Sequence, residues 1–159
     1  MEPTAAVGAP APAEAPTVVG MAHPVMFDDA DPVLARLREI CLALPEAQEK
    51  VSHGRPSFFT TKVFASYGGT ARGDKDREAH SRSLLFVPDA ADRPALLEDG
   101  RFYEPAYLWP SGWLGLDLAS PAAEVQVDWT EVAELVDASY RLTASARLVR
   151  LLDDAGGAQ

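Results

Sequence analysis

The chain has 159 residues, of which 47% are hydrophobic and 24% charged, and this length and composition predict one globular domain with a real core. The net charge of −10 argues against nucleic acid as a partner, because phosphate contacts supply most of the non-specific affinity for it. No apolar run reaches the ~20 residues of a membrane-spanning helix, and the sequence shows neither a secretory signal nor paired cysteines, so we expect a cytoplasmic protein with no membrane partner.

The first 26 residues are predicted to be a disordered tail. They are rich in Ala and Pro and show neither helical nor strand periodicity, so they cannot bury enough apolar surface to offset the entropy of ordering. Residues 27–152 follow as the predicted single domain, and residues 153–159 are expected to form a flexible C-terminus.

A first helix is predicted to begin after Asp31, where a carboxylate suited to N-capping precedes a proline at the first helical position. Apolar residues then recur at spacings of three and four as far as Leu44, and Pro45 ends the helix. Cys41 belongs to this apolar stripe, so we interpret it as a small buried hydrophobe and not as a reactive thiol.

The middle of the chain has the composition of antiparallel strands, being rich in aromatic and β-branched residues. The strands are predicted over residues 49–53, 57–67 and 83–87. Gly54 and Pro56 bracket Arg55 in a predicted turn that displays this cation between two strands. Residues 70–82 form a long polar loop at the tip of a hairpin, and loops of this length are functional or mobile.

The last part of the chain supplies the covering helices. The predicted elements are a short helix over 92–99, a strand over 113–118, a helix capped by Asp128 or Thr130, and final helical turns over 145–152. Together the elements predict an α+β fold, a two-layer sandwich in which N- and C-terminal helices cover one face of an antiparallel sheet.

Positive charge is concentrated in residues 50–82, which carry seven Lys or Arg against three Asp or Glu, a net charge of +4 in an otherwise acidic chain. This segment is our first candidate for contact with DNA or another anion. Its candidate binding residues are Arg55, Lys62, Arg72, Lys75, Arg77 and Arg82. The alternative is that these cations are the solvated rim of a sheet whose aromatic residues form the core.

The rival hypothesis is a module that binds a small ligand or a protein on an aromatic-lined face of the sheet. The residues predicted to line this pocket are His53, Phe58, His80, Tyr107, Trp109 and Trp113.

No catalytic constellation accompanies these residues. The sequence has no nucleophile elbow, phosphate-binding loop or dinucleotide fingerprint, so we predict neither catalysis nor a cofactor. Two histidines, His53 and His80, make a poor metal site without a third ligand, and no metal is predicted. An enzyme that uses one of them as an acid–base group is kept as a third alternative.

Several segments together resemble the MmcQ/YjbR-like family of small bacterial proteins. These segments are residues 37–45 (LREICLALP), 53–58 (HGRPSF), 62–65 (KVFA), 93–97 (RPALL), Tyr107 with 112–113 (GW), and 139–142 (SYRL). The resemblance extends over residues 31 to about 150. It implies a fold like that of secretion chaperones and frataxin, and DNA binding through a double-wing arrangement of hairpins. The long loop over 68–82 departs from the compact members of the family.

Overall fold

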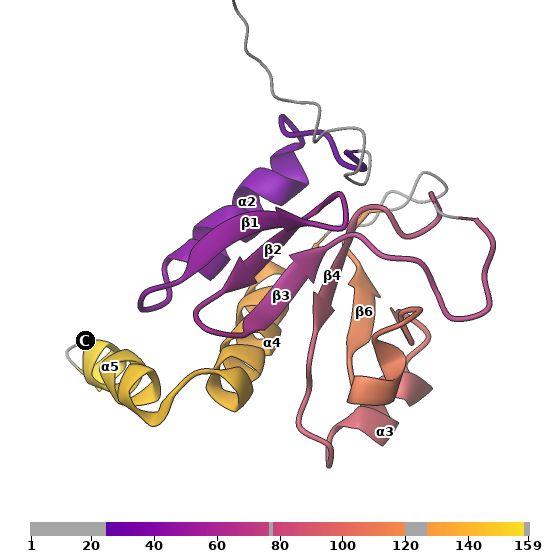
Figure 1. Cartoon of the computed structure of the whole chain (residues 1–159). Helices are drawn as coiled ribbons and strands as arrows, with labels where there is room; N and C mark the ends of the chain where they lie inside the picture. The colour runs from indigo at the N-terminus through magenta and orange to yellow at the C-terminus, as the bar shows by residue number, and fades with distance from the viewer. Residues whose placement is uncertain (1–24, 77, 120–126, 158–159) are drawn as a thin grey trace, which may run out of the picture.

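The structure is a computed structural model that describes residues 25–76, 78–119 and 127–157. These residues form an α+β fold of two layers, as predicted (Figure 1). Residues 1–24 of the expected disordered tail and the candidate cation Arg77 lie outside the described residues, so the predictions for them stay untested.

Helix α2 (Pro32–Leu42) begins where the sequence predicts. The carboxylate of Asp31 accepts a hydrogen bond from the backbone N–H of Val33 at 2.9 Å, which confirms the N-cap. The buried residues of the helix are Leu34, Leu37 and Cys41. Burial raises the pKa of the Cys41 thiol, as expected for a cysteine that packs in the core as a hydrophobe.

The sheet has six strands, and every neighbouring pair is antiparallel. In chain order the strands are β1 (Gln48–Ser52), β2 (Arg55–Phe59), β3 (Val63–Tyr67), β4 (Ser83–Phe86), β5 (Phe102–Tyr103) and β6 (Leu114–Asp117). Their order across the sheet is β1-β2-β3-β4-β6-β5. The end of β3 and the starts of β2 and β4 therefore meet at one end of the sheet, where the long loop also lies.

The predicted turn around Arg55 is wrong in position by one residue. The two-residue turn consists of His53 and Gly54, both with positive φ (53° and 81°), because Ser52 pairs directly with Arg55. Two positive φ values give the backbone twist that joins antiparallel strands tightly, and glycine takes such a conformation without strain. Arg55 is consequently the first residue of β2 and does not project from a turn.

The single strand predicted over 57–67 is a hairpin of two strands, β2 and β3. The register shifts between them, so that Phe58 pairs with Ala65 and Phe59 with Val63, and Phe64 is left without a direct partner. Strand propensity gave no sign of this turn, because residues 60–62 contain neither glycine nor proline.

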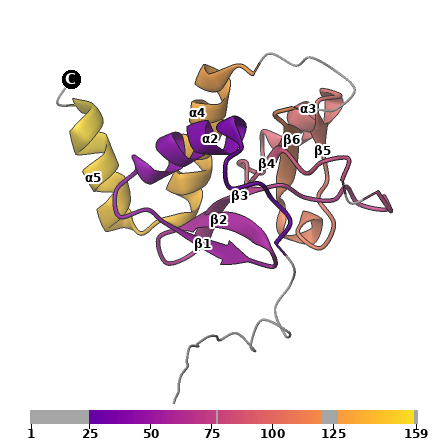
Figure 2. The ribbon, with the colours of Figure 1, turned by 90° about the horizontal axis from the view of Figure 1, so that it is seen from above.

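Helix α4 (Trp129–Thr143) and α2 lie on the same face of the sheet, which Figure 2 shows from above. The Asp128 carboxylate accepts a hydrogen bond from the backbone N–H of Glu131 at the start of α4, as predicted. The ring of Tyr140 meets that of Phe64 edge-on, with centroids 5.3 Å apart. These contacts hold the helical layer to the centre of the sheet.

Three further helices complete the described fold. They are α3 (Arg93–Glu98), the 3-10 helix η3 (Trp109–Ser111) and α5 (Ala146–Gly157). Helix α5 continues past the predicted end at Leu152 and stands to one side of the sheet, with Leu148 buried against the core (Figure 1). Within the described ranges no helix combines the length and apolarity needed to span a membrane.

Candidate functional site

The loop between β3 and β4 is tied to the sheet at both of its ends. The backbone N–H of Gly69 donates to the carbonyl of His80 at 3.0 Å, which closes the base of the loop. Ala71 forms a β-bridge with Pro105, farther along the loop. The last residues of the loop, from His80 onward, therefore enter β4 in a fixed geometry and contribute side chains to two different sites.

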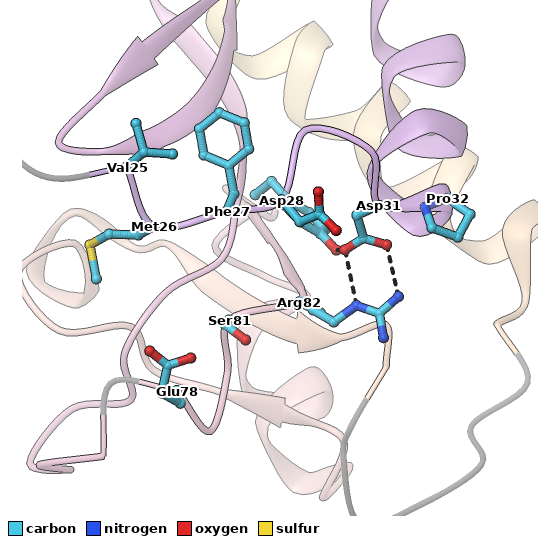
Figure 3. A pocket seen from close by; sticks show the side chains of 10 residues that line it. Val25, Met26, Phe27, Asp28, Asp31, Pro32, Glu78, Ser81 and Arg82 are labelled. Atoms are coloured by element: carbon cyan, nitrogen blue, oxygen red, sulfur yellow. Dashed lines mark hydrogen bonds and ion pairs between the residues drawn. The ribbon is translucent and has the colours of Figure 1, made fainter.

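The first site is an open cavity of about 790 Å³ at this end of the sheet, which we call the sheet-end cavity (Figure 3). It lies between the segment before α2, the start of α2 and the returning loop. Its lining residues are Val25, Met26, Phe27, Asp28, Asp31, Pro32, Tyr67, Glu78, Ser81 and Arg82. Segments as far apart in the sequence as Val25 and Arg82 thus meet around one hollow.

A closed polar network forms one wall of the sheet-end cavity. Asp31, only 7% exposed, accepts two hydrogen bonds from the guanidinium of Arg82, at 3.0 Å from Nε and 2.8 Å from Nη2. The hydroxyl of Tyr67 donates to the same carboxylate at 2.6 Å. Burial alone would raise the pKa of Asp31, but the hydrogen bonds from Arg82, Tyr67 and Val33 outweigh it and hold this pKa below its ordinary value.

The rest of the cavity lining is divided between apolar and acidic groups. Val25, Met26, Phe27 and Pro32 supply apolar surface, and Asp28 and Glu78 supply two further carboxylates. Among the described lining residues, three carboxylates and the guanidinium of Arg82 give a net charge of −2. The oxygen atoms of Asp28 and Glu78 belong to different segments, one before α2 and one in the loop (Figure 3).

The second site is a group of polar side chains on the sheet face opposite the helices, which we call the open-face cluster: His80, Ser83, Tyr103 and Asp117. Ser83 pairs with Asp117 in the sheet, and along β4 it alternates with the core residue Leu84, so it points away from the helices. The Nδ1 atom of His80 lies 2.8 and 3.0 Å from the two carboxylate oxygens of Asp117. The imidazole stacks on the ring of Tyr103, with centroids 4.0 Å apart.

The hydrogen bonds of the open-face cluster join its members to one another and to the backbone. The Ser83 hydroxyl lies 2.6 Å from the Tyr103 hydroxyl and 2.8 Å from the backbone carbonyl of His80, to which it donates. The serine oxygen is thus not aligned with the imidazole, and the arrangement is not that of a nucleophile with its base. Burial raises the pKa of Tyr103, which keeps its hydroxyl protonated.

Close packing leaves the cluster little freedom. A Cβ atom placed on Gly115 would lie 2.3 Å from Cζ of Tyr103, so the tyrosine ring rests directly on this glycine. A Cβ on Gly69 would lie 3.0 Å from the hydroxyl oxygen of the same tyrosine. We therefore interpret the open-face cluster as a structural group that holds the end of the long loop to the sheet.

The five predicted cations that the structure describes lie in separate places. Lys62 is exposed in the β2–β3 turn, at the far end of the sheet from the long loop. Arg72 stacks on Trp109 at 3.6 Å and forms an ion pair with Glu104 at 3.0 Å. Arg82 is paired with Asp31, and Arg55 is half-buried at the start of β2. Lys75 is exposed near the tip of the loop.

The aromatic-lined pocket predicted from the sequence is not assembled as expected, because none of its six residues lines the sheet-end cavity. Phe58 is fully buried in the core, since strand alternation turns its side chain toward the helices. Tyr107 is 93% exposed, and His53 is exposed in its turn. The other three residues are His80 in the open-face cluster, Trp109 beneath Arg72, and the half-buried Trp113 just before β6.

Sequence reasoning found Asp31 as a helix cap and Arg82 as a cation but missed that they form one network with Tyr67. Asp31 and Tyr67 are 36 positions apart, and Arg82 is 51 positions from Asp31. No local pattern marks such a pairing. Among the described residues, no three His, Cys, Asp or Glu side chains come together in a way that could hold a metal ion.

Comparison with known families gives a match to the sequence model of the family described as YjbR, over residues 42–142. The matched range runs from the end of α2 through the whole sheet to the end of α4. Searches of curated proteins and of solved structures gave no match.

Proposed function

The chain belongs to the YjbR family, and we propose that it is a non-catalytic binding module whose ligand occupies the sheet-end cavity. The observation that carries this proposal is the cavity itself, an open hollow of about 790 Å³ with both apolar and charged lining. Binding sites for small ligands and peptide side chains have this mixture, in which apolar surface supplies affinity and a few polar groups fix orientation.

The open-face cluster supports a role without catalysis. Its serine is bonded to Tyr103 and to a backbone carbonyl, and its histidine to Asp117, so a nucleophile activated by a base is absent from this group of four. The described residues that line the sheet-end cavity include neither histidine nor cysteine. Its described side chains are suited to recognition by charge and shape.

Contact with DNA through the 70–82 loop is the second candidate function. The exposed side chains of Arg72 and Lys75 favour it, because they lie on the same loop and face solvent. The exposed acids Asp74, Asp76 and Glu78 of that loop oppose it by placing negative charge beside the same phosphates. The cavity is therefore our first proposal.

The test is a titration of the full chain, labelled with ¹⁵N, with three probes of matched shape: 2-phenylethylamine, 2-phenylethanol and 3-phenylpropionate. We expect at least one probe, at about 1 to 10 mM, to shift the backbone amides of Met26, Phe27 and Ser81. Ser81→Trp fills the cavity and should abolish these shifts. Ser111→Trp, an exposed position in η3, should not.

The proposal is contradicted if no probe moves the cavity amides. In that case the second candidate is tested with a short DNA duplex of ~20 base pairs at ~50 mM salt. If the duplex moves the amides of Arg72 and Lys75, DNA contact becomes the first candidate function.

A further inference from the structure

Building on the proposed function, we infer that the sheet-end cavity takes an organic cation, namely a primary ammonium or guanidinium group carried on an apolar chain or ring. The inference concerns the class of ligand. It depends on which charges in the cavity are already compensated, which are not, and what surface lies beside them.

The carboxylate of Asp31 is compensated within the protein. It receives two hydrogen bonds from the Arg82 guanidinium and one from Tyr67, and it also caps α2. The one cation among the described lining residues is thus paired with the buried carboxylate, and the pair presents no net charge to a ligand.

The other two carboxylates are not compensated. Among the described residues, neither Asp28 nor Glu78 forms an ion pair. Asp28 accepts a hydrogen bond from the backbone N–H of Ala30 at 2.9 Å, and this leaves its negative charge in place. Figure 3 shows that Asp28 comes from the segment before α2 and Glu78 from the loop, so the two carboxylates add negative charge to separate parts of the cavity lining.

Apolar side chains lie next to these carboxylates. Val25, Met26 and Phe27 follow one another along the chain and line the cavity with Pro32. Such a wall favours a hydrocarbon portion on the ligand.

An anionic ligand would meet the opposite conditions. It would enter a cavity whose described lining residues carry a net charge of −2, in a chain of net charge −10. It would also have to compete with Asp31 for the guanidinium of Arg82. The same argument disfavours the phosphates of nucleic acids at this site.

The cation could come from a free amine or from a lysine side chain of a protein partner. The two sources share the chemistry recognised here, and two arms of one experiment separate them. The first arm uses 2-phenylethylamine, and the second uses the blocked dipeptide N-acetyl-Phe-Lys-amide, whose only cation is on the side chain. The compound with the lower dissociation constant identifies the source as a free amine or a lysine side chain.

The decisive measurement compares the dissociation constants of the amine, the alcohol and the propionate probes, taken from the shifts of the cavity amides. We expect the amine to bind at least about fivefold more tightly than the alcohol, and the propionate most weakly. Glu78→Gln and Asp28→Asn should each weaken amine binding by roughly two- to fivefold and leave alcohol binding unchanged. Glu98→Gln, an exposed acid in α3 at the other end of the sheet, is the matched control and should change neither.

The results separate the ligand class from the proposed function. If the alcohol or the propionate binds in the cavity as tightly as the amine, the ligand class is wrong and the proposed function stands. The ligand class is equally wrong if the amine binds but Glu78→Gln and Asp28→Asn leave its affinity unchanged. If no probe binds in the cavity, both fail together.

Discussion

The two sites on either side of the His80–Ser83 segment use similar residue types to different ends. In the open-face cluster, His80 and Ser83 are bonded to Asp117, Tyr103 and the backbone, and a tyrosine ring packed on Gly115 excludes further atoms. On the other side, the segment borders a hollow in which Asp31, Tyr67 and Arg82 bond to one another, while Asp28 and Glu78 form no ion pair with a described residue. Polar groups that satisfy one another hold a fold together, whereas polar groups left facing a cavity are available to a ligand.

The comparison also bears on the cations that the sequence analysis predicts to contact an anion. Three of the predicted cations are engaged or dispersed: Arg72 with Glu104, Arg82 with Asp31, and Lys62 at the far end of the sheet. Among the described residues that line the sheet-end cavity, the carboxylates without an ion pair are those of Asp28 and Glu78. The following changes break or sharpen the contrast between the closed network and the open cavity.

The largest effect is expected from Asp31→Ala. The change leaves the half-buried Arg82 without its partner, removes the acceptor of Tyr67 and deletes the cap of α2. We expect a loss of about 3 to 5 kcal/mol in the free energy of unfolding, measured by denaturant titration. Asp128→Ala, which removes only a cap from α4, is the control and should cost about 1 kcal/mol. Equal losses in the two variants would show that the network contributes little.

A smaller effect is expected from Gly115→Ala in the open-face cluster. The added methyl group would overlap the Tyr103 ring, whose Cζ lies 2.3 Å from the new Cβ position, and should cost roughly 1 to 3 kcal/mol. Gly100→Ala places its Cβ where no atom lies within 4 Å, and should change stability by less than ~0.5 kcal/mol. If thermal melting shows both variants unchanged, the cluster is looser than the structure indicates.

The pH dependence of the Asp31 network is expected to be smaller again. Because the pKa of Asp31 is lower in the folded chain than its ordinary value of 3.8, its contribution is complete above that value and is lost as the pH falls through the lowered pKa. The difference in unfolding free energy between wild type and Asp31→Asn should therefore be largest near neutral pH and should narrow below pH 3.8. A difference that stays constant down to pH 2 would contradict this assignment.

The smallest effect on stability is expected from Glu78→Gln. This side chain is exposed and has no ion pair among the described residues, so the unfolding free energy should change by less than ~0.5 kcal/mol. The variant separates binding from folding, because the same carboxylate is needed for the proposed cation. A clear loss of unfolding free energy in chemical denaturation would show that Glu78 stabilises the fold, as the residues of the open-face cluster do.

The fold could be predicted from the sequence because its signals are local. Asp31 and Asp128 cap helices within three residues of their own positions, and strand composition marked most of the sheet. The turn was predicted one residue too late, because His53, which is not a glycine, has a positive φ there. Pro56 was interpreted as a turn residue, but it is the second residue of β2.

The candidate site could not be predicted, because its contacts join distant positions. Pairing of Asp31 with Tyr67 and Arg82 depends on how α2 is placed against the end of β3, and no residue pattern encodes that placement. The side-chain alternation that buries Phe58 was obscured in turn by the register shift beside it. The fold class and family are confirmed, and the binding role stays a proposal.

The closed base of the long loop suggests a place where this chain can be extended. The Gly69–His80 hydrogen bond and the Ala71–Pro105 bridge hold the loop to the sheet below its tip, and no atom lies within 4 Å of the Cβ position at Gly73. Added residues there would lengthen a loop whose ends are already fixed, and each doubling of loop length costs only about 0.6 kcal/mol. A peptide tag inserted after Gly73 would let the folded protein be captured on a surface while both termini and the lining of the sheet-end cavity stay unmodified.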